Sequence, residues 1–280
     1  MSRPCTGKGC LVNAWTTYAL AFAVALSTLA SSSAGADEGD VKVDATYEIS
    51  IAGWGIARAT LDLRYQQGKY SADLLMLPKG VARIVTAVRT KVEAEGRLRG
   101  DRVEPSRYRV RATETDKPVS VDMSLNAGNV TKVNARPPLK HRPGRIAVTT
   151  AHKRGIVDPL SSGLIPIRSQ DGRDACDRTL KIYDGWTRYD VRLTYKGQRA
   201  VSTQGFSGKV AVCAARWVPV SGHQPGKKEV QYLADNTDLE MTVVPIPAAG
   251  VAIPYGVAIG TPNGRIVIEP SAMNISVTGV

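Results

Sequence analysis

The residues that could do chemistry are few in this chain, and their spacing matches no enzyme signature. Of the three histidines, His141 and His152 lie in a basic, proline-rich stretch without a nearby carboxylate, which is a poor setting for a zinc site. The GFSG sequence at 205–208 lacks the spacing of the G-x-S-x-G nucleophile motif and is more typical of a hairpin turn. No phosphate-binding loop, dinucleotide fingerprint or H-E-x-x-H motif occurs. We therefore predict a protein without an enzymatic role, a metal site or a cofactor.

The carboxylates also have structural interpretations. Glu93 and Glu95 share the solvent-facing side of a predicted strand, where solvation accounts for both. Asp158 precedes a proline, and this order is typical of a helix start, because an aspartate oxygen accepts hydrogen bonds from the free amides of the first turn. We interpret Asp158 as a helix cap rather than as a catalytic acid.

The first 36 residues have the pattern of a secretory signal peptide. Arg3 and Lys8 give it a positive start, residues 19–29 form an uncharged apolar run, and the AGA sequence at 34–36 is a small-residue cleavage site. The run is too short for a membrane span, and no later stretch approaches the roughly 20 apolar residues that a span needs. We expect an exported protein that is cleaved after Ala36 and then has no transmembrane span.

Cysteine usage agrees with export. Cleavage would remove Cys5 and Cys10 and leave only Cys176 and Cys213. In an oxidising compartment these two have one intramolecular pairing open to them, and neither belongs to a C-x-x-C pair of the kind that redox catalysts use. The sequence therefore predicts a structural disulfide. Asp37, rather than a cysteine, follows the cleavage site, so no lipid anchor is expected.

Positive charge is concentrated in one segment of a chain whose net charge is +12. No acidic residue occurs between Asp122 and Asp158. The basic cluster there consists of Lys132, Arg136, Lys140, Arg142, Arg145, Lys153 and Arg154. Lysine and arginine bind phosphate and carboxylate groups by charge-assisted hydrogen bonds, so the cluster is a candidate anion-binding site; the alternative is a solvated loop. Export argues against nucleic acid and leaves lipid head groups, lipopolysaccharide and cell-wall polymers as anionic partners.

Alternation of apolar and polar residues dominates the rest of the chain. Between 57 and 65, apolar side chains at odd positions alternate with polar ones, and stretches 88–98 and 188–195 repeat the pattern, with Arg188 on the polar side. One apolar and one wet face are typical of antiparallel sheets. Turn signals occur at 67–68 (Gln-Gly) and at 262–264 (Pro-Asn-Gly). We predict about fourteen strands.

Helical signals are sparse. Apolar spacing predicts one short helix near 79–86, and the Asp158 cap predicts a second over Leu160 to Leu164. Trp54 stands between two glycines that interrupt a long strand, which suggests a bulge or tight hairpin. Its indole then either completes the core, which we favour, or covers the rim of an apolar cavity.

A proline-rich segment divides the chain. Three prolines between 136 and 147 exclude a central strand there, so this segment is a loop or the seam between halves at about 41–135 and 175–278. We prefer a single all-β domain over 37–280, with a basic connection near 136–157, because neither half has a complete set of covering elements.

Several blocks resemble one family of exported bacterial proteins, the domain of unknown function 3108 family. The resemblance lies in the hairpin from Tyr47 to Tyr65, the DPLS turn at 158–161, the block from Cys176 to Gly185, and Val212-Cys213 with Arg216. It extends over roughly residues 43–270 and implies a periplasmic or envelope protein with a curved antiparallel sheet, similar at fold level to lipoprotein-carrier half-barrels. The resemblance implies no activity and no catalytic residues.

The sequence therefore predicts an all-β protein: one strongly curved antiparallel sheet, a half-barrel or open barrel, wrapped around one or two short helices. Three functional hypotheses remain open. The protein binds or carries an amphiphile such as a lipid or a lipoprotein acyl chain, with its anionic head on the basic segment. Alternatively, it is an envelope scaffold that binds protein or cell wall through a sheet edge or the basic loop. The third is a hydrolase whose site is assembled only by folding.

Overall fold

The computed structural model describes residues 39–80, 82–85, 87–114 and 116–278. The predicted signal peptide and its cleavage site lie outside the described residues. The described residues all belong to one compact unit. No helix within the described residues is both long and apolar enough to cross a membrane.

Strands make up most of the fold, as the alternating pattern predicts. The strands are β1 (Asp40–Ile51), β2 (Trp54–Gln66), β3 (Lys69–Pro78), β4 (Arg89–Arg99), β5 (Arg102–Thr113), β6 (Val119–Asn126), β7 (Asn129–Arg136), β8 (Ile165–Pro166), β9 (Arg178–Tyr183), β10 (Arg188–Thr203), β11 (Phe206–Ser221), β12 (Leu239–Ile246), β13 (Val251–Ile259) and β14 (Ile266–Thr278). The helices are α1 (Ala82–Val85) and α2 (Lys228–Asp235), with 3-10 turns at Ala151–Lys153, Ser161–Gly163, Arg173–Ala175 and Pro247–Ala249.

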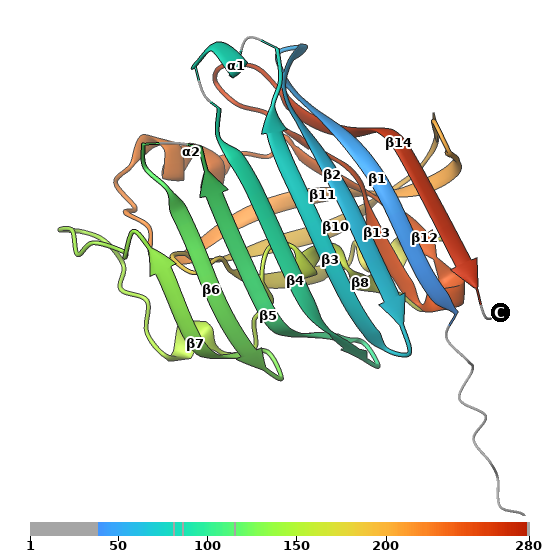
Figure 1. The fold of residues 1–280 in the computed structure, drawn as a ribbon, viewed down its shortest axis with the longest axis horizontal. Coiled ribbons are helices and arrows are strands. Elements are labelled where there is room, and N and C mark those ends of the chain that lie inside the picture. Colours follow the sequence, from blue (N-terminus) through green and yellow to red (C-terminus); the bar gives the residue numbers. More distant parts are fainter. Residues whose placement is uncertain (1–38, 81, 86, 115, 279–280) are drawn as a thin grey trace, which may run out of the picture. The chain divides into compact units, whose positions relative to one another are not determined.

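One 14-stranded antiparallel sheet contains all the strands, and its order joins two meanders. β1 to β7 follow one another across one half, β9 to β14 follow one another across the other, and β1 pairs with β14 where the halves meet. Both edges therefore come from the middle of the sequence. The sheet curls, so that β10 and β11 cross behind β2 to β4 (Figure 1). The edges β7 and β9 do not pair, and the predicted strongly curved, open sheet is confirmed.

Residues 137–177, the crossing segment, connect the two edges. The segment begins in the predicted proline-rich loop and then passes inside the curl, where its Ser161–Gly163 turn contacts β4, β5 and β13. It also bridges the open edges: the Ile156 amide donates to Gly128 O at 2.8 Å, and the Val157 amide donates to Lys181 O at 2.9 Å. The crossing segment thus occupies the interior that a curled sheet would otherwise leave empty.

Local backbone preferences explain the reversal between β2 and β3. Gln67 and Gly68 both adopt left-handed backbone angles (φ 49° and 73°), which suits the two-residue hairpin predicted between β2 and β3.

The predicted helix near 79–86 is the single turn α1. The predicted helix after Asp158 is one 3-10 turn. The amphipathic helix α2 was not predicted, although Val230, Leu233 and Ala234 have helical spacing.

Two predictions about side-chain position are wrong. Trp54 does not complete the core: it is 69% exposed, because the left-handed pair Ala52 and Gly53 turns the chain beyond the end of the packed interior. Arg188 does not face solvent: it is 6% exposed. Its guanidinium can be buried because Asp190 lies 2.6 Å away and the carbonyl of Tyr189 accepts a hydrogen bond from it.

Candidate functional site

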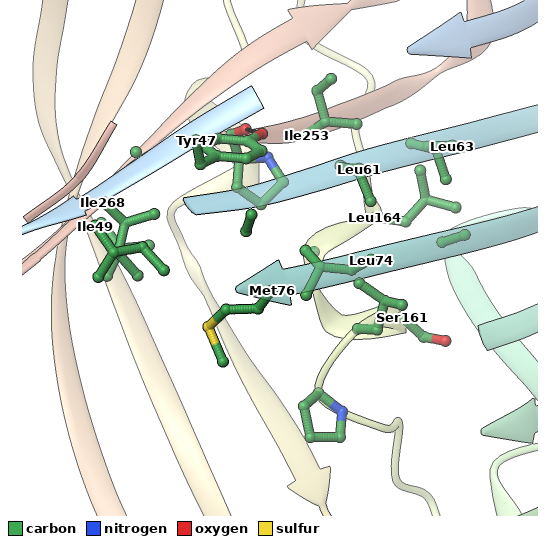
Figure 2. Close-up of a pocket in the computed structure, with 18 of the residues that line it drawn as sticks. Tyr47, Ile49, Leu61, Leu63, Leu74, Met76, Ser161, Leu164, Ile253 and Ile268 are labelled. Atoms are coloured by element: carbon green, nitrogen blue, oxygen red, sulfur yellow. Dashed lines mark hydrogen bonds between the residues drawn. The ribbon is translucent and has the colours of Figure 1, made fainter. Parts of the chain in front are cut away.

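An apolar hollow of about 270 Å³ lies inside the curl, between β1 to β3, the crossing segment and β13. Figure 2 shows its lining, which includes Tyr47, Leu61, Leu74, Met76, Leu164 and Ile253. The strand residues face inward because side chains alternate along a strand. We call this space the apolar hollow.

Small residues opposite large ones leave this space open. Tyr47 is directly opposite Ala59, and Ala59 is directly opposite Met76 on the next strand. Leu63 is likewise opposite Ala72. An alanine between larger side chains cannot fill its share of the interior, so the inner face of β1 to β3 is concave and apolar.

The Pro159–Gly163 turn of the crossing segment has the apolar hollow on one side. A second apolar hollow, of about 300 Å³, lies on its other side. Pro159, Gly163 and Pro254 line both spaces. The second apolar hollow also contacts Trp217 of β11 and Leu233 of α2. A Cβ atom at Gly163 would lie 3.2 Å from the Pro254 ring, so glycine allows the turn to pass close to β13 between the two spaces.

Polar atoms at the apolar hollow already have partners. The Tyr47 hydroxyl donates to Pro254 O at 2.8 Å, and the Tyr70 hydroxyl donates to Ser161 Oγ at 2.7 Å. Burial raises the pKa of both tyrosines, so both remain neutral near pH 7. The lining therefore favours an apolar ligand rather than a polar one.

Asp158 lies beneath the turn and is completely buried. One carboxylate oxygen accepts hydrogen bonds from the amides of Leu160 (3.0 Å) and Ser161 (2.9 Å), as a capping side chain does. Its other oxygen has no hydrogen-bond partner among the described residues. Burial raises its pKa to about 6, while the hydrogen bonds act in the opposite direction.

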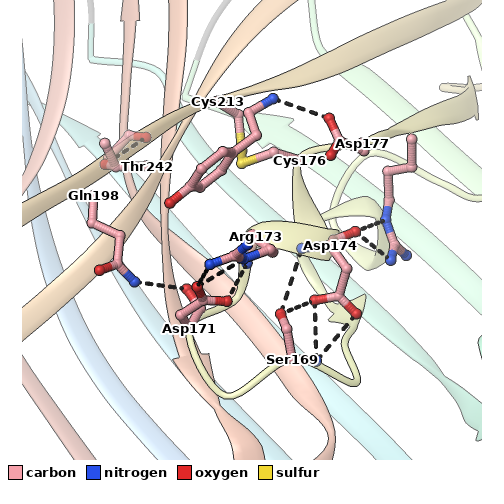
Figure 3. Close-up of a disulfide and its surroundings, with 12 residues drawn as sticks. Ser169, Asp171, Arg173, Asp174, Cys176, Asp177, Gln198, Cys213 and Thr242 are labelled. Atoms are coloured by element: carbon pink, nitrogen blue, oxygen red, sulfur yellow. Dashed lines mark hydrogen bonds and ion pairs between the residues drawn. A yellow bond between two sulfur atoms is a disulfide. The ribbon is translucent and has the colours of Figure 1, made fainter.

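The predicted disulfide is confirmed. Cys176 and Cys213 are joined with a Cα–Cα distance of 5.1 Å, and both are fully buried. Figure 3 shows that the nearby carboxylates of Asp171, Asp174 and Asp177 are hydrogen-bonded or ion-paired to neighbouring parts of the chain. Asp177 accepts from the Tyr195 amide at 3.1 Å, and Asp171 pairs with Arg173 at 2.7 Å.

The seven residues of the basic cluster do not line these hollows. Lys132, Arg136, Lys140, Arg142 and Arg154 are exposed. Arg145 donates to the carbonyl of Gly222, and Lys153 lies 5.9 Å from the centre of the Tyr183 ring. Trp54 lines neither hollow. The anion-binding role of the cluster therefore stays a prediction.

Sequence reasoning missed the residues that shape the site. The Tyr70–Ser161 contact joins positions that only the crossing of the interior brings together, and no local pattern indicates it. The alternation from 57 to 65 does identify one lining strand, β2. No group of three or more His, Cys, Asp or Glu side chains in the described part of the chain has an arrangement that could hold a metal ion.

Comparisons with known proteins give one family and one similar structure. The family model described as "Protein of unknown function (DUF3108)" matches residues 46–269. A crystal structure described as a beta-barrel-like protein of a domain of unknown function, DUF1849, from Brucella abortus has a TM-score of 0.48 and 10% identity. That match covers 85% of this chain and 98% of the other. No curated protein matches the chain significantly.

Proposed function

The chain belongs to the DUF3108 family of proteins of unknown function, and from its interior we propose that it binds an amphiphile, such as a lipid or a lipoprotein acyl chain. The apolar part of the ligand occupies the apolar hollow inside the curled sheet. The protein acts without catalysis, as a binding or carrier protein of the periplasm. The apolar lining, with its tyrosine hydroxyls already hydrogen-bonded, is the observation that carries this proposal.

The size of the interior space supports the proposal. Ligand sites in proteins measure about 300–1,000 Å³ and are lined mainly by apolar side chains. The apolar hollow, at about 270 Å³, lies just below this range. The second apolar hollow adds space on the other side of the Pro159–Gly163 turn, and a flexible chain that bends around this turn would use both.

The disulfide supports the location. A buried disulfide is typical of proteins that fold outside the reducing cytosol. The expected signal peptide would deliver the chain to such a compartment, where lipids and lipid-modified proteins are available as ligands.

Titration with dodecanol tests the proposal, because this ligand has an apolar chain and no charge. Leu74→Trp fills the apolar hollow, whereas Leu77→Trp adds the same group on the outer face of the same strand, where Leu77 is 37% exposed. We expect saturable binding by calorimetry that Leu74→Trp weakens at least about 10-fold and Leu77→Trp leaves unchanged. Urea unfolding curves establish that both variants fold. Absence of binding to the original protein, or equal effects of the two variants, would contradict the proposal.

A second candidate function is a scaffold that binds an envelope partner. Its support is the edge strand β7, which among the described strands pairs only with β6, and the exposed residues Arg136, at the end of β7, and Lys140 and Arg142, which follow it. Capture of one defined partner that Leu74→Trp preserves and Arg142→Gln abolishes would favour this function over ligand binding.

A further inference from the structure

A third space, of about 410 Å³, opens beside the apolar hollow and differs from it in chemistry. Ser161 and Leu164 line both, so the two spaces are neighbours across the crossing segment. The β4–β5 turn, the β6–β7 turn and β9 complete its lining. We call it the polar hollow, because charged residues from two of these elements line it.

Arg178 of β9 is the most unusual of these charges. Its Nη2 donates to Pro166 O at 2.7 Å and to Asp174 O at 2.8 Å, and its Nε donates to Asp174 O at 3.2 Å. All of these acceptors are neutral carbonyls, and no carboxylate among the described residues lies within ion-pair distance of Arg178. Burial lowers its pKa despite the longer-range attraction of Asp174 and Asp101, but an arginine still remains protonated.

The remaining charges leave the polar hollow with an excess of positive charge. Lys181, on the same strand, has no ion-pair partner among the described residues and is exposed. The two carboxylates at the β4–β5 turn already have arginine partners. Asp101 lies 4.0 Å from Arg102, and Glu104 lies within 4.0 Å of two arginines, 97 and 99. A half-buried guanidinium without a carboxylate is stabilised by any anion that reaches it.

We propose that the polar hollow binds the anionic head, a phosphate or carboxylate, of the amphiphile whose chain occupies the apolar hollow. This inference rests on the proposed function and specifies its ligand class. The ligand passes the crossing segment at Ser161 and Leu164, where the apolar and polar spaces adjoin. Arg178 and Lys181 then neutralise the head, in place of the basic cluster of residues 132–154 that the sequence suggested.

Three ligands distinguish the contribution of the ligand's apolar chain to binding from that of its anionic head. Dodecanol supplies the chain alone, dodecyl phosphate supplies both, and inorganic phosphate supplies the head alone. We expect dodecyl phosphate, below its micelle concentration, to bind the full protein at least about 10-fold more tightly than dodecanol. Inorganic phosphate should bind far more weakly than dodecyl phosphate and compete with it only at high concentration.

Variants of the residues that line the polar hollow test whether it causes the tighter binding of dodecyl phosphate. Lys181→Gln should remove most of the advantage of dodecyl phosphate without changing dodecanol binding. Arg178→Gln should do the same, and Lys181→Gln keeps the test decisive if Arg178→Gln fails to fold. Lys209→Gln, at an exposed position of β11 that does not line the polar hollow, is the matched control and should behave as the original protein.

The outcomes distinguish this inference from the proposed function. Equal affinity for dodecanol and dodecyl phosphate, or equal effects of Lys181→Gln and Lys209→Gln, overturns the head-group site while amphiphile binding stands. If neither dodecanol nor dodecyl phosphate binds, both the head-group site and the proposed function are overturned. Inorganic phosphate as tight as dodecyl phosphate, and lost in Lys181→Gln, identifies a free-anion site and overturns the assignment to an amphiphile.

Discussion

The hydroxyl of Tyr70 donates a hydrogen bond to Ser161 Oγ across 2.7 Å, although the two residues are 91 positions apart in the chain. Tyr70 belongs to β3 and Ser161 to the turn that passes inside the curled sheet, and both side chains are buried. This bond therefore fixes the crossing segment against the sheet at the place where the apolar hollow and the polar hollow adjoin.

Removal of this hydrogen bond should destabilise the protein. Tyr70→Phe keeps the ring and loses the donor, so we expect the free energy of unfolding to fall by about 1 kcal/mol. Urea unfolding measures the change. Tyr232→Phe is the matched control, because Tyr232 is 40% exposed on α2 and its substitution should have no effect. Equal changes in the two variants would show that the Tyr70–Ser161 bond does not stabilise the interior.

The sequence predicts the local elements well, because their causes are local. The alternation from 57 to 65 places Ala59, Leu63 and Tyr65 in the core, and the Gln67-Gly68 turn follows from the backbone preferences of those residues. The disulfide follows from a count of cysteines. For the strand and the turn, a short stretch of residues carries the full physical reason.

The order of the strands and the composition of the site depend on contacts between residues far apart in the sequence, so no short stretch of sequence predicts them. Asp40 pairs with Thr278, which joins opposite ends of the described chain, and no pattern near either residue indicates that choice. The burial of Arg188 depends on strands β9 and β11 on both sides of it. Arg178 was part of a block that resembled a family, but its lack of a carboxylate partner is visible only after folding.

Loss of the disulfide should lower stability strongly. The bond joins residues 37 positions apart, and closing a loop of this length contributes about 4 kcal/mol in the chain-entropy account. We expect the double substitution Cys176→Ser/Cys213→Ser to reduce the free energy of unfolding by that order, and reductant to do the same to the original protein. Cys5→Ser/Cys10→Ser is the control, since we expect that region to be removed on export. Unchanged melting of the first variant without reductant would refute a stabilising role.

The buried ion pair and an exposed one should respond differently to the same substitution. Asp190→Asn leaves the Arg188 guanidinium, whose side chain is 7% exposed, without its counter-charge, and should cost about 3 kcal/mol of stability. Asp73→Asn removes one partner of Lys91 on the outer face, where both side chains are about half exposed, and should cost less than about 1 kcal/mol. Chemical unfolding at neutral pH compares the two. Similar losses would mean that burial does not strengthen the Arg188–Asp190 pair.

Asp158 should make the protein less stable as the pH rises from about 4 to about 6. Burial raises the pKa of its carboxyl from 3.8 to about 6, so in this interval the folded state holds a proton that the unfolded state has released. Folding is therefore penalised progressively up to the folded pKa, by about 3 kcal/mol in total. Asp158→Asn retains an oxygen for the Leu160 and Ser161 amides and cannot ionise. Its free energy of unfolding, relative to the original protein, should rise by up to that amount between pH 4 and pH 7 in urea titrations. Since every other titrating group is common to both proteins, parallel pH profiles would show that the Asp158 pKa is not raised.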